Sequence, residues 1–213
     1  ATWALGPQPQ ASSAPTSIAT DASGMYVVVG SSYSNSLVYI GSNYGTTWVA
    51  AVSPDAQWMS LSITLASNTN DLRIYASSLH NGVYTCSTSS GGGTCYLNPT
   101  LEQGGSTSTW GGVVSDKEKG SQVYAFITNN LESLYYSSDY GGTWYIANVT
   151  PDPSDSQSWY AQSGVWQDIT TDQYGQYVYA CSDLAIFASA DYGLNWVLTT
   201  APVWVSPAWD SIA

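Results

Sequence analysis

The sequence predicts an all-β fold built from a repeated unit of four antiparallel strands. Three observations lead to this prediction: an eight-residue turn motif recurs along the chain, β-rich stretches precede each copy, and helical periodicity is almost absent. A repeat at a period of roughly 40 to 50 residues is a signature of supersecondary units arranged in series. A single repeated unit across 213 residues indicates one domain.

The turn motif has four copies of decreasing clarity. It reads SSDYGGTW at 137–144 and SADYGLNW at 189–196. A weaker copy, GSNYGTTW, occupies 41–48, and the weakest, TSSGGGTC at 88–95, keeps only the Gly and Thr positions and has Cys in place of Trp. We number these turn motifs 1 to 4 in chain order.

The residue types of the motif suit a tight turn between two strands. An Asp or Asn side chain accepts hydrogen bonds from backbone N–H groups ahead of it, and Gly two residues later tolerates positive φ. The Trp enters the returning strand, so we expect Trp48, Trp144 and Trp196 to be mostly buried at equivalent places. The residues to which we assign a structural role in the motifs are Asn43, Gly45, Trp48, Ser137, Asp139, Gly141, Trp144, Ser189, Asp191, Gly193 and Trp196.

Three β-rich stretches precede each motif, and a fourth strand follows it. The first strands are expected around 17–19, 60–62, 112–114 and 168–170. The second strands are expected around 26–29, 73–76, 123–126 and 177–180, and the third around 37–40, 82–84, 134–136 and 186–188. Each unit is therefore one four-stranded antiparallel blade. The predicted blades span approximately 17–53, 58–100, 110–150 and 166–201.

The motif pattern S-x-D-x-G-x-T-W resembles the Asp box of the BNR-repeat superfamily of sialidase-like and sortilin-like β-propellers. The resemblance covers essentially the whole chain and implies a β-propeller of four-stranded antiparallel blades. It also implies that the motifs lie at the blade periphery, away from the mouth that holds the active site in sialidases. Because one fold serves many functions, the resemblance does not fix the activity.

The two ends of the sequence are expected to be partial blades. Residues 1–3 read like the end of a turn motif, and residues 209–213 match the start of a first strand at 166–170. We expect partial blade pieces at 1–6 and 208–213, either as halves of one broken blade or because the chain is an excerpt of a longer one, which we favour. Such edges would be completed by missing segments of the same chain or by neighbouring copies of it.

Composition indicates an extracellular β protein and excludes several partners. Only 8% of residues are charged, 14% are aromatic, and the formal net charge is -12. The fixed cations are Arg73, Lys117 and Lys119, which argues against nucleic acid and anionic membranes as partners. No apolar run is long enough for membrane insertion, and no signal peptide is present.

The cysteines predict one disulfide. Aligning the repeats places Cys86 at the Ser position and Cys95 at the Trp position of turn motif 2, across a hairpin lengthened by two residues. A disulfide would link the two strands across a turn that lacks the Asp and Trp of the motif. The alternative is two free thiols. A metal site is disfavoured because His80 is the only histidine, so we assign no metal and no cofactor. Cys181 is expected to be a buried thiol or to bond with a missing segment or a neighbouring chain.

Asn148-Val149-Thr150 is the one usable N-glycosylation sequon and precedes a proline-rich loop. We therefore assign Asn148 as a candidate glycosylation site. Proline-, serine- and threonine-rich connectors at 7–16 and 151–158 are candidates for O-linked sugar.

We assign no catalytic residue. The resemblance to sialidases implies three arginines that bind the substrate carboxylate, but the chain has one arginine in total. The related xyloglucan-cleaving propellers use two aspartates, as glycosidases commonly do. Here Asp21, Asp116 and Asp172 recur at the turn after the first strand, which predicts that they form turns.

Three functions compete at this stage. We favour a non-catalytic extracellular structural or assembly protein, such as a repeating subunit of a surface filament or coat. A carbohydrate-binding propeller is the second, and a glycoside hydrolase fragment whose catalytic residues lie partly outside the chain is the third. Sugar binding would use tryptophans outside the motifs, although we expect these to pack between blades: Trp58, Trp110, Trp159, Trp166, Trp204 and Trp209.

Overall fold

The computed structural model describes residues 15–33, 36–88, 93–98, 101, 109–128, 134–149, 165–183 and 185–199. Across these residues the chain forms four four-stranded antiparallel sheets and no helix. The predicted fold class, all-β with four-stranded antiparallel blades, is confirmed. The partial blade pieces predicted at 1–6 and 208–213 lie outside the described residues.

Each sheet is a meander in which consecutive strands pair. Blade 1 consists of β1 (Ser17–Thr20), β2 (Val27–Gly30), β3 (Tyr39–Ser42) and β4 (Thr47–Ala50). Blade 2 consists of β5 (Trp58–Leu65), β6 (Leu72–Ser78), β7 (Gly82–Thr88) and β8 (Thr94–Leu97). Blade 3 consists of β9 (Trp110–Ser115), β10 (Val123–Ile127), β11 (Leu134–Ser137) and β12 (Tyr145–Ile146). Blade 4 consists of β13 (Trp166–Thr171), β14 (Val178–Ser182), β15 (Ile186–Ser189) and β16 (Val197–Leu198).

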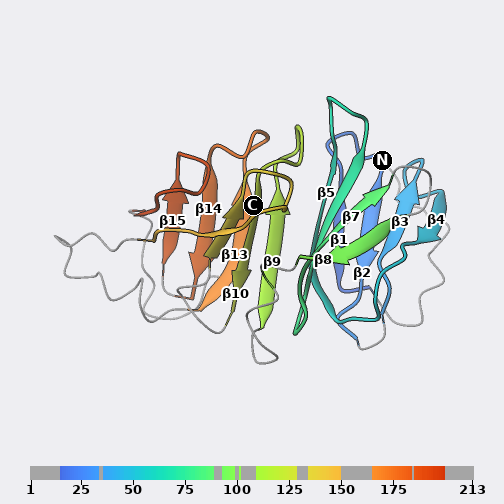
Figure 1. Ribbon diagram of the computed structural model, residues 1–213, viewed down its shortest axis with the longest axis horizontal. Helices are drawn as coiled ribbons and strands as arrows, with labels where there is room; N and C mark the ends of the chain where they lie inside the picture. Colours follow the sequence, from blue (N-terminus) through green and yellow to red (C-terminus); the bar gives the residue numbers. More distant parts are fainter. Residues whose placement is uncertain are drawn as a thin grey trace, which may run out of the picture.

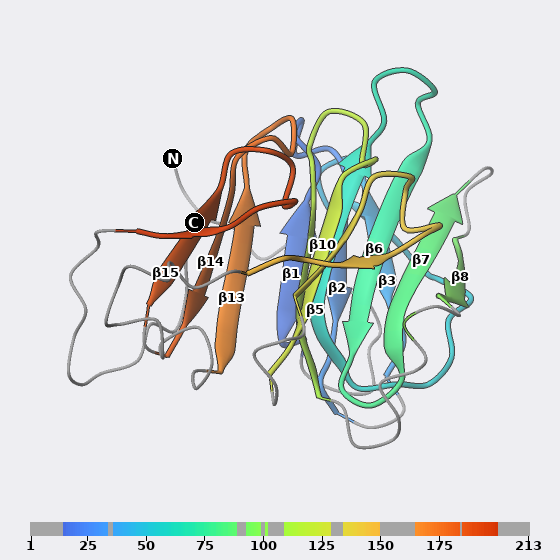
Figure 2. The ribbon, with the colours of Figure 1, turned by 60° about the vertical axis from the view of Figure 1, so that its left-hand side comes forward.

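The blades stand side by side in chain order. Neighbouring blades contact each other through their first strands: β1 packs against β5, β5 against β9, and β9 against β13. Figure 1 shows blades 1 and 2, coloured blue to green, on one side and blades 3 and 4, coloured yellow-green to red, on the other, with β5 and β9 adjoining. Figure 2 shows the same sheets from a second direction, with β13, β14 and β15 at one end. Blades 1 and 4 are therefore the two ends of the described array.

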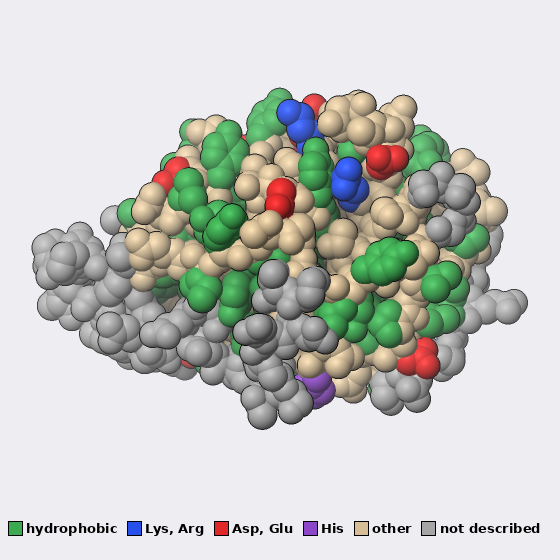
Figure 3. All heavy atoms as spheres, in the orientation of Figure 1, with side chains coloured by type: hydrophobic (Ala, Val, Ile, Leu, Met, Phe, Trp, Pro, Cys, Tyr) green, Lys and Arg blue, Asp and Glu red, His purple; other side chains and the backbone are tan. Residues whose placement is uncertain are grey.

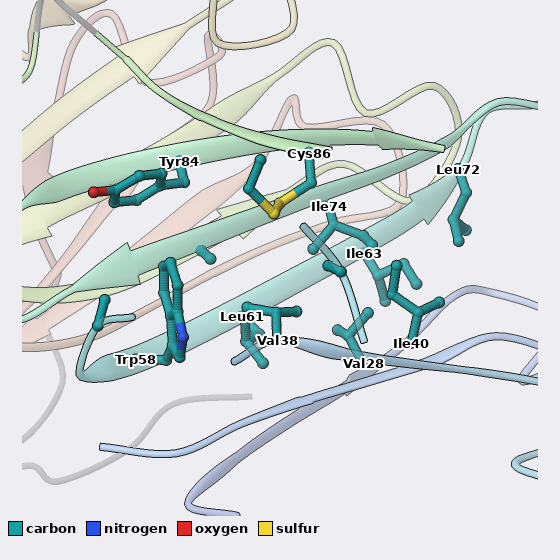
Figure 4. Close-up of a cluster of buried hydrophobic side chains, with 14 residues drawn as sticks. Val28, Val38, Ile40, Trp58, Leu61, Ile63, Leu72, Ile74, Tyr84 and Cys86 are labelled. Atoms are coloured by element: carbon teal, nitrogen blue, oxygen red, sulfur yellow. A yellow bond between two sulfur atoms is a disulfide. The ribbon is translucent and has the colours of Figure 1, made fainter. Parts of the chain in front are cut away.

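The core lies between the sheets. Figure 4 shows the cluster between blades 1 and 2, where Val28 and Ile40 lie with Leu61 and Ile63. A second cluster joins blades 2 and 3, and a third joins blades 3 and 4. Each internal blade thus has one face packed against the preceding blade, which we call its leading face, and one packed against the following blade, its trailing face.

Three tryptophans at the start of first strands are fully buried, which disfavours them as platforms for sugar rings. Trp58, Trp110 and Trp166 are 0%, 2% and 1% exposed. Each lies beside an aromatic ring of the third strand, with centroids 5.2 to 5.4 Å apart: Tyr84, Tyr135 and Phe187. The other tryptophans considered for sugar binding, Trp159, Trp204 and Trp209, lie outside the described residues.

Candidate interaction faces

Turn motif 3 is organised by one serine and one aspartate. Ser137 Oγ donates to Asp139 Oδ1 over 2.8 Å and accepts from the Gly141 N–H over 2.9 Å. The N–H of Thr143 donates to the same carboxylate oxygen over 2.7 Å. The Trp144 indole N–H donates to the Gly141 carbonyl over 2.9 Å. The carboxylate therefore ties the two sides of the turn together, and the indole closes it.

Turn motif 4 has the same geometry. Ser189 Oγ donates to Asp191 Oδ1 over 2.8 Å, and the N–H of Asn195 donates to that oxygen over 2.9 Å. The Trp196 indole donates to the Gly193 carbonyl over 2.9 Å. In both motifs the central Tyr-Gly pair has positive φ, with Gly141 and Gly193 at 77°. Glycine adopts a positive φ more easily than residues that have a Cβ.

The hydrogen bonds of these turns favour ionised carboxylates. Burial alone would raise the pKa of Asp139, but hydrogen bonds from Thr143, Ser137 and Gly142 outweigh it and lower that pKa. For Asp191, hydrogen bonds from the side chain and backbone of Asn195 lower the pKa. Both carboxylates are thus held in structural bonds and kept charged.

Turn motif 1 differs because Gly41 and Asn43 replace the serine and aspartate. Asn43 itself has a φ of 49°, and among the described residues its side chain makes no hydrogen bond. The indole bond survives, since Trp48 Nε1 donates to the Gly45 carbonyl over 2.9 Å. Trp48 is mostly buried, as predicted, but less completely than Trp144 and Trp196, which are 8% and 2% exposed. The physical reason is that Trp144 and Trp196 pack on a preceding blade, and blade 1 has none in the described array.

The disulfide spans turn motif 2, since Cys86 lies before the motif and Cys95 lies at its end. Cys86 and Cys95 are directly opposite each other in β7 and β8, and their sulfurs are bonded at 2.07 Å. Both side chains are buried in the cluster between blades 1 and 2, where Figure 4 shows the sulfur bridge. The disulfide therefore holds the two strands that the serine, aspartate and tryptophan hold in motifs 3 and 4.

A tyrosine and a glycine connect neighbouring blades. The Tyr75 hydroxyl donates to the Gly120 carbonyl over 2.6 Å, and the Tyr124 hydroxyl donates to the Gly175 carbonyl over 2.6 Å. Each tyrosine lies in the second strand of its blade, and each glycine lies in the first turn of the following blade. Both tyrosines are 0% exposed, and burial raises their pKa, so the phenols stay neutral donors.

Strand register defines the equivalent position in every blade. Tyr124 and Tyr179 each pair with the residue just before the motif serine, and Tyr75 pairs with Thr85, just before Cys86, which is aligned with that serine. Val28 holds this position in blade 1. The turn of the following blade has a positive-φ residue in each case. That residue is Gly120 after Tyr75 and Gly175 after Tyr124, but Asn70 after Val28. Where the tyrosine is present the turn has glycine, and where it is absent the turn has asparagine.

Two faces at the ends of the array expose positions that are buried elsewhere. On the leading faces, Leu61, Val113 and Ile169 are 3% to 6% exposed, but the equivalent Ile18 of blade 1 is 69% exposed. On the trailing faces, Tyr75 and Tyr124 are buried, but Tyr179 of blade 4 is 41% exposed. These two faces are the candidate interaction surfaces of the molecule.

The recurring aspartates form turns, as expected. Asp116 is 2% exposed and accepts four backbone hydrogen bonds, from residues 118, 119, 120 and 122, over 2.7 to 3.1 Å. Asp21 accepts from the N–H groups of Ser23 and Tyr26, and Asp172 accepts from that of Tyr177. Across the described part of the chain, no group of three or more His, Cys, Asp or Glu side chains could hold a metal ion.

Lys117 links three blades. Its ammonium lies 3.5 Å from the Thr20 carbonyl of blade 1 and 3.4 Å from the Ile63 carbonyl of blade 2. Burial lowers its pKa, although Asp21 and Asp116 act in the opposite direction. Figure 3 shows how sparse charged side chains are on the face in view. The partly buried Lys117 therefore contributes to the framework at the ends of the first strands.

Asn148 and Cys181 are the remaining predicted sites. Asn148 is exposed two residues after β12, and its backbone forms a parallel bridge with Asn195 of the next blade. Cys181 is buried in β14. Where the structure is described, it has no helix of the length and apolar character needed to cross a membrane.

Similar solved structures are β-propellers. The Cps50 (Swd1) β-propeller domain of Myceliophteria thermophila is 11% identical, with a TM-score of 0.58 over 82% of this chain and 53% of its own. YCF48 bound to D1 peptide is 13% identical, with a TM-score of 0.55 over 93% of this chain and 58% of its own. An ancestral GH74 enzyme is 17% identical, with a TM-score of 0.61 over 92% of this chain and 25% of its own.

These likenesses define the class of protein as a β-propeller. The chain spans between 25% and 58% of the length of the three structures. No family model matches the sequence, and no curated protein matches it.

The Tyr-Gly contact was missed by sequence reasoning. The signal was present, since tyrosine recurs in the second strands at 75, 124 and 179 and glycine recurs in the first turns at 24, 120 and 175. Because the two residues lie in different repeats, aligning the repeats with one another does not show that they meet.

Proposed function

We propose that the chain is a non-catalytic, extracellular structural or assembly protein of the Asp-box β-propeller superfamily, which joins further blades through its two end faces. The single observation that carries the proposal is Ile18, which is 69% exposed where its equivalents are 3% to 6% exposed. An apolar side chain at an established packing position favours burial against a partner. A repeating subunit of a surface filament or coat would use these faces.

Several features support a structural role over catalysis. The carboxylates of Asp21, Asp116 and Asp172 accept hydrogen bonds from the backbone of their own turns. The solved β-propeller YCF48 binds a peptide, which supports a protein partner for a fold of this kind. The likeness to an ancestral GH74 enzyme extends to the fold alone, at 17% identity.

The extracellular setting is part of the proposal and is supported by two observations. Cys86 and Cys95 form a disulfide, a bond that is typical of oxidising compartments. Asn148 is exposed and begins an N-glycosylation sequon. A secreted preparation should therefore lose mass at Asn148 when N-linked glycans are removed enzymatically.

Sedimentation velocity of the purified, oxidised chain tests the assembly proposal. Between about 1 and 100 μM, mass action should shift the distribution to species heavier than one chain. A sedimentation coefficient that stays at the monomer value throughout this range contradicts the proposal. In parallel, the same sample should not cleave sialosides or β-glucans, and cleavage abolished by substitution of one Asp would favour the glycoside hydrolase alternative.

A further inference from the structure

We infer that the partner on both end faces is a second copy of this chain, bound head to tail, with the Tyr179 hydroxyl of one copy donating to the Gly24 carbonyl of the next. This inference rests on the proposed assembly function and names its partner and its central contact. It follows from the two internal interfaces in which the same pair of residue types already meets.

The first argument is the state of Tyr179. Its equivalents, Tyr75 and Tyr124, are 0% exposed and donate over 2.6 Å to a glycine carbonyl in the next blade. Tyr179 is 41% exposed, and within the described residues its hydroxyl has no hydrogen-bond partner. An exposed tyrosine is an amphipathic anchor that gains both burial and a hydrogen bond when it docks.

The second argument is the state of Gly24. It has a φ of 72°, like Gly120 at 72° and Gly175 at 77°. A Cβ at Gly120 would lie 3.4 Å from Arg73 Cδ of the preceding blade, and one at Gly175 would lie 2.5 Å from Gln122 Cβ. At Gly24 no atom of a described residue lies within 4 Å of that position. The turn therefore has the backbone conformation of an occupied site, and no described residue packs on it from the side of a preceding blade.

The third argument is selectivity. Among the described interfaces, tyrosine donates to glycine twice. Blade 1 has Val28 at the tyrosine position, and the turn of the following blade has Asn70 at positive φ in place of glycine. Blade 4 has a tyrosine, Tyr179, and blade 1 has a glycine, Gly24. The two end faces therefore have the same pair of residue types that meets at the internal interfaces. A partner with an unrelated surface would need neither residue.

The surrounding side chains fit the same docking. Ile18 on the leading face of blade 1 is at the position that Leu61, Val113 and Ile169 use to pack on the preceding blade. Docking would bury it beside Tyr179, as Val113 and Tyr75 share one cluster between blades 2 and 3. The contact is heterologous, since it joins two different faces, and it either closes a ring or propagates as a filament.

Photo-crosslinking tests this contact on the intact chain. Benzoylphenylalanine at position 179, in a mixture of isotopically light and heavy copies, should give cross-linked peptides that contain residues 21–26 of a different copy. Cross-links confined to one copy would mean that another part of the same chain covers blade 4, and cross-links to the outer strands would mean a different interface. Either result overturns the inference.

Substitution separates this inference from the proposed function. Tyr179→Phe should weaken self-association by about tenfold, the value of one net hydrogen bond, and Tyr179→Ala by about thirtyfold or more, as for an aromatic anchor. The matched control is Tyr96→Ala, because Tyr96 is 67% exposed on the outer strand of an internal blade. Thermal melts should show all three variants folded. If wild-type protein assembles and Tyr179→Ala assembles equally well, the inference fails while the assembly function stands; if wild-type protein is monomeric, both fail.

Discussion

The glycine of the turn motif has the same backbone conformation in motifs 1, 3 and 4 but not the same surroundings. Gly45, Gly141 and Gly193 all have a φ of 77°. A Cβ at Gly193 would lie 2.7 Å from Tyr124 Cε1 of the preceding blade, and one at Gly141 would lie 2.9 Å from Thr85 Oγ1. At Gly45 the nearest atom, Trp48 Cζ2, is 3.5 Å away. In motifs 3 and 4 glycine is therefore required for two reasons: its backbone has a positive φ, and the preceding blade leaves no room for a Cβ. In motif 1 only the first reason applies.

Gly193→Ala and Gly45→Ala separate these two requirements. Both substitutions place alanine at positive φ, which we expect to lower the free energy of unfolding by about 1 kcal/mol. Gly193→Ala should lower it by roughly a further 1 to 3 kcal/mol, because the new methyl group overlaps Tyr124. Urea denaturation measures both values, and equal losses would contradict the packing of motif 4 on blade 3.

The Asp191 carboxylate should stabilise the fold only when it is ionised. Removing its hydrogen bonds with Asp191→Ala should lower the free energy of unfolding by about 1 kcal/mol at pH 7. Because folding lowers the pKa of Asp191 below its ordinary 3.8, this stabilisation is present above that pH and is lost as the pH falls through the folded-state pKa. The difference between wild-type and variant proteins should therefore shrink in denaturation at about pH 2.5. A difference that is the same at both pH values would show that the carboxylate charge is not involved.

At the scale of the element, one hairpin is held by a covalent bond where the others are held by hydrogen bonds. Cys86 and Cys95 are nine residues apart. Reduction, or the double change Cys86→Ser and Cys95→Ser, should lower the free energy of unfolding by about 2 to 3 kcal/mol. Reductant should produce no further loss in the double variant, which controls for effects elsewhere. Thermal melts of oxidised and reduced protein that coincide would contradict a stabilising role.

The strands and turns could be predicted from sequence because each depends on nearby residues. The serine, aspartate and glycine of motifs 3 and 4 act within one hairpin, so their pattern predicts the turn. The lower burial of Trp48 relative to Trp144 and Trp196 was not predicted, because it depends on a neighbouring blade and not on the motif. The Tyr75 contact with Gly120 was missed for the same reason, since it joins residues 45 apart in different repeats.

At the scale of the whole molecule, charge opposes assembly while the end faces favour it. Each copy has a formal net charge of -12, so copies repel one another at low ionic strength. Raising the salt concentration from about 10 to 100 mM shortens the Debye length from roughly 30 to 10 Å and should strengthen self-association. Sedimentation equilibrium at the two salt concentrations measures this. Association that weakens with salt would point to a charged interface, contrary to contacts made by Ile18 and Tyr179.

The central claim is that the internal blade interface is repeated between copies, and complementary variants test it most directly. Ile18→Arg blocks the leading face of blade 1, and Tyr179→Arg blocks the trailing face of blade 4; both side chains are exposed in one copy, so both variants should fold. Each variant alone should sediment as a monomer. Mixed in equal amounts, they retain one intact pair of faces, and we predict a one-to-one dimer that grows no further. If the mixture stays monomeric while the wild-type protein assembles, or if either variant assembles alone, the head-to-tail interface is contradicted.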